Sequence, residues 1–455
     1  MLGQVKIDML PDDVLLEIFD FYREGIIDTR WIYPWRWKIL IQVCRRWRCV
    51  IFGSPRRLKL QIVCTNTTPT RTSLAIWPPF PIHIACVYID EKSVENVIAA
   101  VELGHDRVLH ISIDNIKGSA LEKLATAMQQ PLPALTSFSL ISYDWQSVPV
   151  LSETFLGSAP RLKLFILQGV PFPTFPQYIL SYTHICYLRI LDIPDSGYIS
   201  PNAMVACLAA LPNLEFLHIG FGSPLSRPPQ ITPPPRIRIV LPALTELLFI
   251  GVSEYLEDFV ARIDTPLLDT FDITFFMDLN FEIPQLGHFI RRAGRLEPLD
   301  QARMTFDDDV INVEVSPRFW LQIRCEFERP DWQLSLMVQI FSQLLSHVEQ
   351  LEICQSSLDG VDWTDPDMDS SPWLELFHLF IALQRLYVSE ELVTPVAAAL
   401  QELTEGGTMG VLPALQSLFL QGPEPSGPVP EGVQSFVAAR QLSDHHIAVQ
   451  RWNRS

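Results

Sequence analysis

A recurring eight-residue unit constrains the fold of this 455-residue chain more than any other feature of its sequence. The unit reads Pro-x-Leu-x-x-Leu-x-Leu, and Phe or Ile replaces Leu in some copies. Six copies carry the proline, at 133–140, 160–167, 212–219, 242–249, 266–273 and 413–420. Four looser copies lack it, at 106–113, 183–190, 346–353 and 381–388. Repetition of this kind has to be interpreted before a fold is assigned, because one copy cannot bury its apolar side chains alone.

The spacing of the copies indicates one supersecondary unit per copy. Successive starts lie 27, 27, 23, 29, 30 and 24 residues apart up to residue 266, and 35 and 32 residues apart in the last three copies. These periods match leucine-rich repeats or slightly exceed them. Each copy reads as a short strand with alternating apolar residues. Helical patterns separate the strands, at 93–103, 120–129, 202–211, 254–263 and 394–403.

We therefore expect an α/β fold in which an irregular leucine-rich-repeat-like solenoid has a parallel sheet on its concave side and helices on its convex side. The alternative is a compact α/β domain whose strands share a Leu-x-Leu pattern.

Two regions interrupt the regular spacing of the copies. No clean copy lies in 275–345, although 309–315 and 318–326 alternate like strands, so one or two degenerate repeats with longer loops are expected there. The segment 223–236 holds six prolines and predicts an extended surface loop, or less readily a ligand for a proline-binding module.

The first sixty residues follow a different pattern, that of short amphipathic helices. In the first helix one apolar stripe is predicted from Val14, Leu15, Ile18, Phe19 and Tyr22. A second helix, over 37–52, places on one side Leu40, Val43, Cys44, Trp47, Val50 and Ile51. Helices this short are marginal alone, so they need each other, the following domain or a partner. An ordinary helical cap on the repeat domain is the alternative interpretation.

The motifs of this segment resemble an F-box. They are Leu10-Pro11, Ile18-Phe19, the run Val43-Cys44-Arg45-Arg46-Trp47, and Ser54-Pro55 with Leu58. The connection over 25–37 is longer than the family usually has. Together with the repeats, and with the segments 74–78, 436–440 and 449–452, the chain resembles F-box proteins with a divergent leucine-rich-repeat domain, a kind abundant in fungi.

This resemblance implies that the protein is the substrate-recognition subunit of an SCF-type cullin-RING ubiquitin ligase. Residues 1–58 would form the F-box, 59–80 a linker and first edge strand, 81–440 the solenoid with an irregular part at 275–345, and 441–455 a C-terminal cap or tail. The F-box would bind the ligase adaptor, and cullin through it, while the solenoid would bind an unknown protein substrate. Residues implied to form or support the adaptor-binding surface are Leu10, Pro11, Val14, Leu15, Ile18, Phe19, Val43, Cys44 and Trp47. A repeat scaffold for protein–protein interaction without a ligase role is the alternative function.

Charge favours an acidic partner for the N-terminal segment. Residues 1–60 carry 11 Lys or Arg and 7 Asp or Glu, a net charge of +4, whereas the other 395 residues carry −22. Complementary charge speeds encounter and orients docking. The overall charge of −18 opposes nucleic acid as the partner.

Composition and motifs predict an intracellular protein that is not an enzyme. No run approaches the length of a membrane span, so no membrane association is expected. The eight cysteines form no Cys-x-x-Cys pair, which indicates reduced thiols and a cytoplasmic or nuclear location.

A calcium-like run at 365–369 has Ser370 and Leu376 where a calcium-binding loop needs Gly and Glu. Gly220-Phe221-Gly222 lacks a third glycine, and His445-His446 lacks further ligand types nearby. We therefore predict no catalytic, cofactor or metal residues, and an enzyme with an unrecognised site remains a third interpretation.

Overall fold

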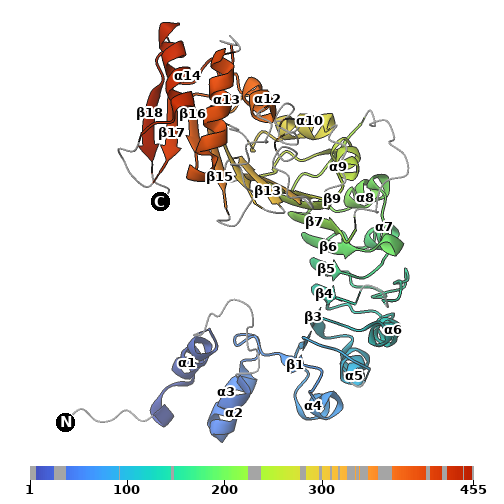
Figure 1. The fold of residues 1–455 in the computed structure, drawn as a ribbon. Coiled ribbons are helices and arrows are strands. Elements are labelled where there is room, and N and C mark those ends of the chain that lie inside the picture. Colours follow the sequence, from blue (N-terminus) through green and yellow to red (C-terminus); the bar gives the residue numbers. More distant parts are fainter. Residues whose placement is uncertain are drawn as a thin grey trace, which may run out of the picture. The chain divides into compact units, whose positions relative to one another are not determined.

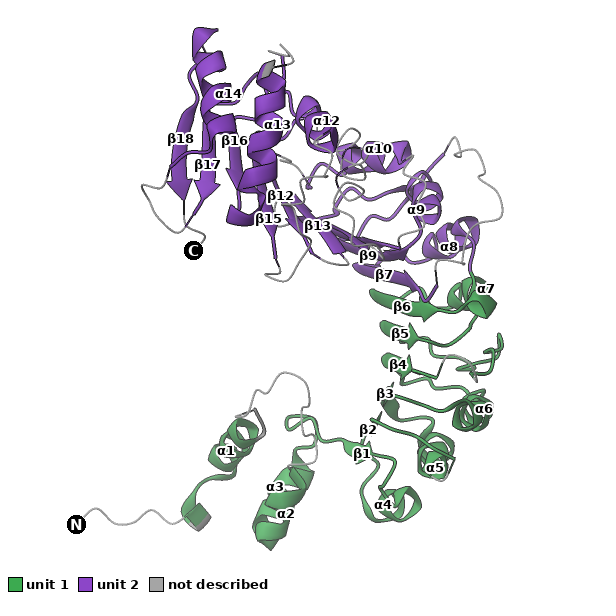
Figure 2. Ribbon diagram, viewed as in Figure 1, with its two compact units in different colours: residues 1–198 green, residues 199–455 purple. Residues whose placement is uncertain are grey.

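The computed structural model describes residues 7–24, 37–91, 93–144, 148–223, 237–276, 283–296, 300–307, 310–315, 318–324, 334, 338, 347–356, 371–405, 410–422, 428–443 and 445–452. It divides into two compact units, Met1–Tyr198 and Ile199–Ser455 (Figure 2). The fold is mixed α/β, and its strands form a large, mostly parallel sheet (Figure 1). This confirms the α/β fold class.

Unit 1 begins with helices and continues as alternating strands and helices. The N-terminal helices are α1 (Asp12–Glu24), α2 (Trp37–Val43) and α3 (Arg45–Gly53), preceded by a 3-10 turn at Ile7–Met9. The strands are β1 (Ile62–Cys64), β2 (Ile82–Cys86), β3 (Val108–Ile113), β4 (Ser137–Ile141), β5 (Leu164–Gln168) and β6 (Tyr187–Ile193). Between them lie α4 (Thr70–Ile76), α5 (Val94–Gly104), α6 (Gly118–Ala127) and α7 (Phe175–Ile179). Each strand pairs in parallel with the next one along the chain.

Unit 2 continues the alternation from α8 (Pro201–Leu208). Its sheet runs in the order β7 (Phe216–Phe221), β9 (Glu246–Gly251), β11 (Thr270–Phe275), β14 (Phe319–Arg324), β13 (Val310–Val315), β12 (Gln301–Phe306), β15 (Gln350–Gln355), β16 (Arg385–Val388), β17 (Ser417–Gln421) and β18 (Ala448–Trp452). The helices are α9 (Ser253–Val260), α10 (Pro284–Arg292), α12 (Ser371–Leu379), α13 (Val393–Glu405) and α14 (Glu431–Leu442). Strands β8 (Ile239–Val240) and β10 (Ile263–Asp264) form a separate parallel pair.

Every one of the ten predicted copies contains a strand, and each of these strands has a parallel neighbour. The reason lies in the turn that precedes it. In the copy at 133–140 the amide of Leu135 donates to the carbonyl of Leu132 at 3.1 Å, so Pro133 occupies the second position of a four-residue turn. Proline suits that position because its fixed φ matches the turn. Equivalent hydrogen bonds close the turns at Pro160, Pro212, Pro266 and Pro413.

The three apolar positions of the unit build the core. They are buried in all six proline-containing copies: Leu135, Phe138, Leu140, Leu162, Phe165, Leu167, Leu214, Leu217, Ile219, Leu244, Leu247, Phe249, Leu268, Phe271, Ile273, Leu415, Leu418 and Leu420. The register stacks equivalent positions on neighbouring strands, as in Phe138, Phe165 and Leu188. The expected helices are confirmed as α5, α6, α8, α9 and α13. In unit 1 the helices α4 to α7 lie on one side of the strands (Figure 1), and along β2, β4 and β5 buried positions alternate with half-buried ones.

The described part of the region 275–345, where one or two degenerate repeats with longer loops were expected, departs from the parallel order of the other copies. The expected strands exist as β13 and β14, but β13 is antiparallel to both of its neighbours. The chain leaves β11, forms α10 and enters the sheet at β12, and it then returns through β13 to β14, which lies beside β11. This inverted meander explains why no leucine-repeat spacing is visible there. The proline-rich segment lies almost wholly outside the described residues, as does the calcium-like run.

A half-buried carboxylate caps one helix of unit 2 and leads to a prediction about the pH dependence of stability. Glu257 of α9 accepts the backbone N–H groups of Gln285 (2.9 Å) and Leu286 (2.6 Å) at the start of α10. Burial raises the pKa of Glu257 from 4.5 to about 7, against the opposing effect of these two hydrogen bonds. The folded protein thus binds this proton more tightly than the unfolded chain. The resulting stabilisation is fully present below about pH 4.5 and is lost as the pH rises through about 7.

Replacing Glu257 by Gln should remove this dependence, because the amide keeps an acceptor and does not titrate. Relative to wild type, the variant should gain about 1 kcal/mol in free energy of unfolding between about pH 5 and about pH 8, a value reduced for partial exposure of the group. Urea unfolding at both pH values measures this difference, with the exposed Glu122→Gln as the control. A wild-type-minus-variant difference that does not change with pH would contradict the assignment.

Candidate docking surface

The helix α1 has two apolar sides, one buried and one exposed, whereas a single apolar stripe was predicted. Leu15, Leu16 and Phe19 are buried. Val14, Ile18, Phe21 and Tyr22 are exposed along a second line of the helix, and 78 % of Phe21 is accessible to solvent. We call these four residues the outer stripe. Because residues four and seven apart share a face of a helix, Val14, Ile18 and Phe21 form one continuous line.

The inner side of α1 packs against α3. The rings of Phe19 and Trp47 meet edge to face with their centroids 4.7 Å apart. Trp47 and Leu15 are both buried. The Phe19 and Trp47 rings thus form part of the core between α1 and α3, in the edge-to-face geometry that aromatic side chains prefer.

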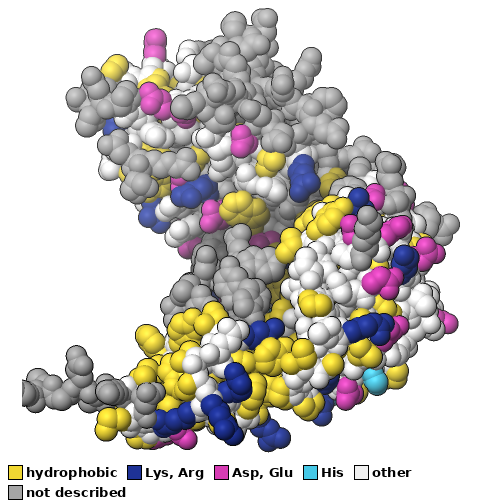
Figure 3. Space-filling model, turned by 90° about the horizontal axis from the view of Figure 1, so that it is seen from below, with side chains coloured by type: hydrophobic (Ala, Val, Ile, Leu, Met, Phe, Trp, Pro, Cys, Tyr) yellow, Lys and Arg dark blue, Asp and Glu magenta, His cyan; other side chains and the backbone are white. Residues whose placement is uncertain are grey.

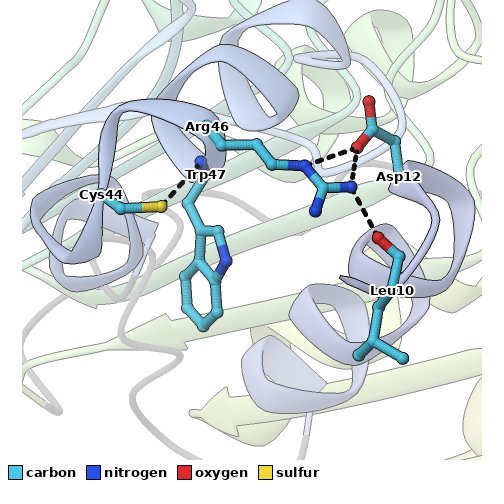
Figure 4. Close-up of polar contacts among 5 residues, drawn as sticks. All are labelled: Leu10, Asp12, Cys44, Arg46 and Trp47. Atoms are coloured by element: carbon cyan, nitrogen blue, oxygen red, sulfur yellow. Dashed lines mark hydrogen bonds and ion pairs between the residues drawn. The ribbon is translucent and has the colours of Figure 1, made fainter. Parts of the chain in front are cut away.

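The second predicted helix, over 37–52, is in fact two helices, so that prediction is wrong in its continuity. Cys44 separates α2 from α3 with extended backbone angles (φ −156°, ψ 168°). Its sulfur accepts the backbone N–H of Trp47 at 3.4 Å and so caps α3 (Figure 4). A cap at this point lets α3 change direction and bring Trp47 to α1.

Two arginines fasten α1 to the following helix region. Arg46 donates to the carboxylate of Asp12 through Nε (3.2 Å) and Nη2 (2.6 Å), and through Nη2 to the carbonyl of Leu10 (2.6 Å), as Figure 4 shows. Arg57 forms an ion pair with Glu17, one turn further along α1. The Leu10-Pro11 start of the helix is thereby held by a basic residue of the Cys-Arg-Arg-Trp run.

Replacing Arg46 by Ala should loosen α1 measurably. The pair with Asp12 is partly exposed, so its loss should cost about 0.5–1 kcal/mol, equivalent to about two- to fivefold faster amide exchange in α1. Hydrogen–deuterium exchange of peptides from α1 measures this effect. Arg45→Ala is the matched control, because Arg45 is exposed and the described residues give it no side-chain hydrogen bond. Equal exchange in both variants would contradict the role of Arg46.

The outer stripe continues into neighbouring apolar residues. Met9, just before α1, is 75 % exposed, and Val43 at the end of α2 is 57 % exposed. Ile7 and Ile39 are exposed as well. Figure 3 shows hydrophobic side chains gathered over the N-terminal helices with Lys and Arg beside them. Contiguous exposed apolar surface of this kind marks interaction sites in soluble proteins.

The nine residues implied by the F-box resemblance fall into three groups. Pro11, Val14, Ile18 and Val43 are exposed, and Leu10 and Cys44 are half-buried. Leu15, Phe19 and Trp47 are buried and are therefore core residues within the monomer. The prediction did not include Met9, Phe21 and Ile39. Ile39 could have been found from the sequence, because it lies four residues before the predicted Val43 and therefore on the same side of α2.

Basic side chains are exposed on α3 and just after it. Arg45, Arg48, Arg56 and Lys59 are exposed. Arg48 also donates through Nε to the carbonyl of Ile41 at 3.1 Å, which holds its stem against α2. The N-terminal helices thus expose apolar side chains on α1 and basic side chains on and after α3 (Figure 3), a combination suited to an acidic partner.

The helices are attached to the strand region by an aromatic cluster. Trp37 of α2 is buried, and its ring centroid lies 5.3 Å from that of Trp77 and 5.7 Å from that of Phe80. Its indole N–H donates to the carbonyl of Gln61 at 3.1 Å. The segment 59–80, predicted as a linker and first edge strand, contains β1 at the edge of the sheet together with α4 and these packing residues.

Neither metal-binding groups nor a membrane span is found in the described part of the chain. No cluster of three or more His, Cys, Asp or Glu residues there has the geometry to hold a metal ion. None of the described helices has the length and apolar character needed to cross a bilayer. Gly220-Phe221-Gly222 lies at the end of β7, and His445 and His446 are exposed.

No protein-family model and no curated protein matches this chain.

Proposed function

We propose that the protein is a substrate receptor of an SCF-type cullin-RING ubiquitin ligase, in which the N-terminal helices bind the adaptor and the strand region binds the substrate. The observation that carries the proposal is the outer stripe. An apolar line along α1 that stays exposed in the monomer fits a protein partner with an apolar groove, and the exposed basic side chains of α3 fit an acidic surface on that partner. The F-box and solenoid assignments belong to this proposal. They rest on the Leu-Pro, Ile-Phe and Val-Cys-Arg-Arg-Trp motifs and on the ordered parallel repeats.

The direct test is reconstitution with purified components. The full-length protein is mixed with the adaptor bound to cullin, and co-elution in size-exclusion chromatography is compared between wild type and a Leu10→Ala/Pro11→Ala variant. We expect a complex with wild type and a weaker one with the variant, because these two apolar residues directly precede α1 and its outer stripe, and Pro11 is exposed. Equal recovery of the adaptor with both proteins would favour the second candidate, a repeat scaffold without a ligase role.

A further inference from the structure

The sheet of unit 2 has one face packed by helices and one face that the described helices leave open (Figure 2). In β11 the buried residues are Phe271, Ile273 and Phe275, while Asp272 and Thr274 between them are only half-buried. The register places the open-face side chains of eight strands in one row. In order across the sheet, that row consists of Leu248, Asp272, Trp320, Glu314, Arg303, Glu352, Tyr387 and Phe419.

Most of this row is satisfied by contacts within the sheet. Arg303 lies between two acids, 3.7 Å from Glu314 and 2.9 Å from Glu352. Tyr387 stacks flat on Phe419 with the ring centroids 4.3 Å apart and the planes at 5°. These five residues therefore already have partners within the sheet, since Arg303 pairs with both acids and the two aromatic rings stack on each other.

The adjacent row has the same character. Gln322 donates through Nε2 to Oδ1 of Asn312 at 3.1 Å. Thr274 donates through its hydroxyl to Oε1 of Gln322 at 3.5 Å. The polar side chains of this adjacent row thus hydrogen-bond to one another and not to the carboxylate of Asp272.

Asp272 differs from its neighbours. Among the described residues, no ion pair and no side-chain hydrogen bond involves the carboxylate of Asp272 or that of the exposed Glu246, which lies on the adjoining strand of the same face. Burial and the charge of Glu246 raise the pKa of Asp272. A half-buried carboxylate beside a like charge is therefore left without the counter-charge that would stabilise it.

Apolar side chains flank Asp272 on both neighbouring strands, and we call the three residues together the notch. Trp320 is its register partner on β14, and 38 % of that residue is exposed. Leu248 is its register partner on β9. Neighbouring strands lie about 4.8 Å apart, so the indole and the carboxylate can contact the same ligand group.

A guanidinium group fits this combination best. It is planar, so it can stack on the indole while its N–H groups donate to a carboxylate, and it is less strongly hydrated than an ammonium group. We propose that Asp272, Glu246 and Trp320 bind an arginine side chain of a protein partner on the open face of unit 2. Binding of arginine stands by itself, and only the identification of that partner as a ubiquitination substrate rests on the proposed function.

The experiment uses the full-length protein labelled with 5-fluorotryptophan. The fluorine resonance of Trp320 is assigned by its absence in Trp320→Phe, and the labelled protein is titrated with Nα-acetyl-arginine amide. We expect a saturable shift of that resonance. Nα-acetyl-citrulline amide, which keeps the planar shape without the charge, should produce no such shift, and the lysine analogue should bind more weakly.

Two variants separate the notch from general acidity. Asp272→Asn should weaken arginine binding at least about fivefold. Glu352→Gln removes an acid of the same row that already pairs with Arg303, and it should leave the affinity unchanged. The other tryptophan resonances report whether each variant is folded. A Trp320 resonance that does not respond to arginine, an equal response to citrulline, or unchanged affinity in Asp272→Asn would overturn the proposal.

The same samples distinguish this proposal from the ligase role. Adaptor binding should be the same in wild type and Asp272→Asn, because the outer stripe lies in unit 1. Failure of wild type to bind the adaptor would remove the ligase role while the arginine titration still stood.

Discussion

Replacing Ile18 by aspartate is expected to weaken binding of the ligase adaptor at least about 100-fold, equivalent to about 2.8 kcal/mol. Ile18 lies in the middle of the outer stripe and is exposed in the monomer. An interface that buries it would have to bury the new carboxylate without a partner, which costs more than the loss of apolar contact alone. Isothermal titration of the purified adaptor into wild type and variant measures the change.

The matched control is Ile76→Asp. Ile76 is an isoleucine of α4 in the same unit and is 68 % exposed, so the chemical change is identical and neither substitution disturbs the core. We expect the control to bind the adaptor like wild type. Melting curves of both variants should coincide with that of wild type. Adaptor binding that survives Ile18→Asp would show that the outer stripe is not the docking surface.

The sequence predicted the presence of the N-terminal helices better than it predicted which side of α1 is buried. Periodicity identifies α1 as amphipathic, but apolar residues at 14, 15, 18, 19 and 22 cover an arc wide enough for two neighbouring stripes. Only the position of Trp47 shows which half is internal, since it packs on Phe19. The break at Cys44 had no clear signal, because cysteine is not among the residues that usually cap helices.

In the repeat region, the proline turns and the alternating apolar positions were sufficient to place ten parallel strands. The same alternation does not encode strand direction, so 301–324 could not be recognised as an inverted meander. The arginine notch depends on that inversion. Asp272 and Trp320 are 48 positions apart, and they become neighbours because β14 returns to the side of β11. Neither residue stood out in the sequence.

Replacing Phe165 by Ala should lower the free energy of unfolding by about 3–5 kcal/mol. Phe165 is the second apolar position of the copy at 160–167 and is fully buried. Its ring centroid lies 5.5 Å from that of Phe138 on β4 and 5.6 Å from that of Phe175 on α7. The substitution therefore opens a cavity between two neighbouring repeats and the helix that covers them. Urea unfolding followed by circular dichroism measures the loss.

Ile166→Ala is the matched control for this substitution. Ile166 is the next residue along β5 and points to the open face, where it is only half-buried. Its truncation therefore removes less buried apolar surface than Phe165→Ala does. We expect the free energy of unfolding to fall by less than about 1.5 kcal/mol. Similar losses for both variants would mean that both faces of β5 are packed. The alternation that separates the core from the open face in the repeats would then fail, and with it the reason for proposing a partner on the open face of the sheet.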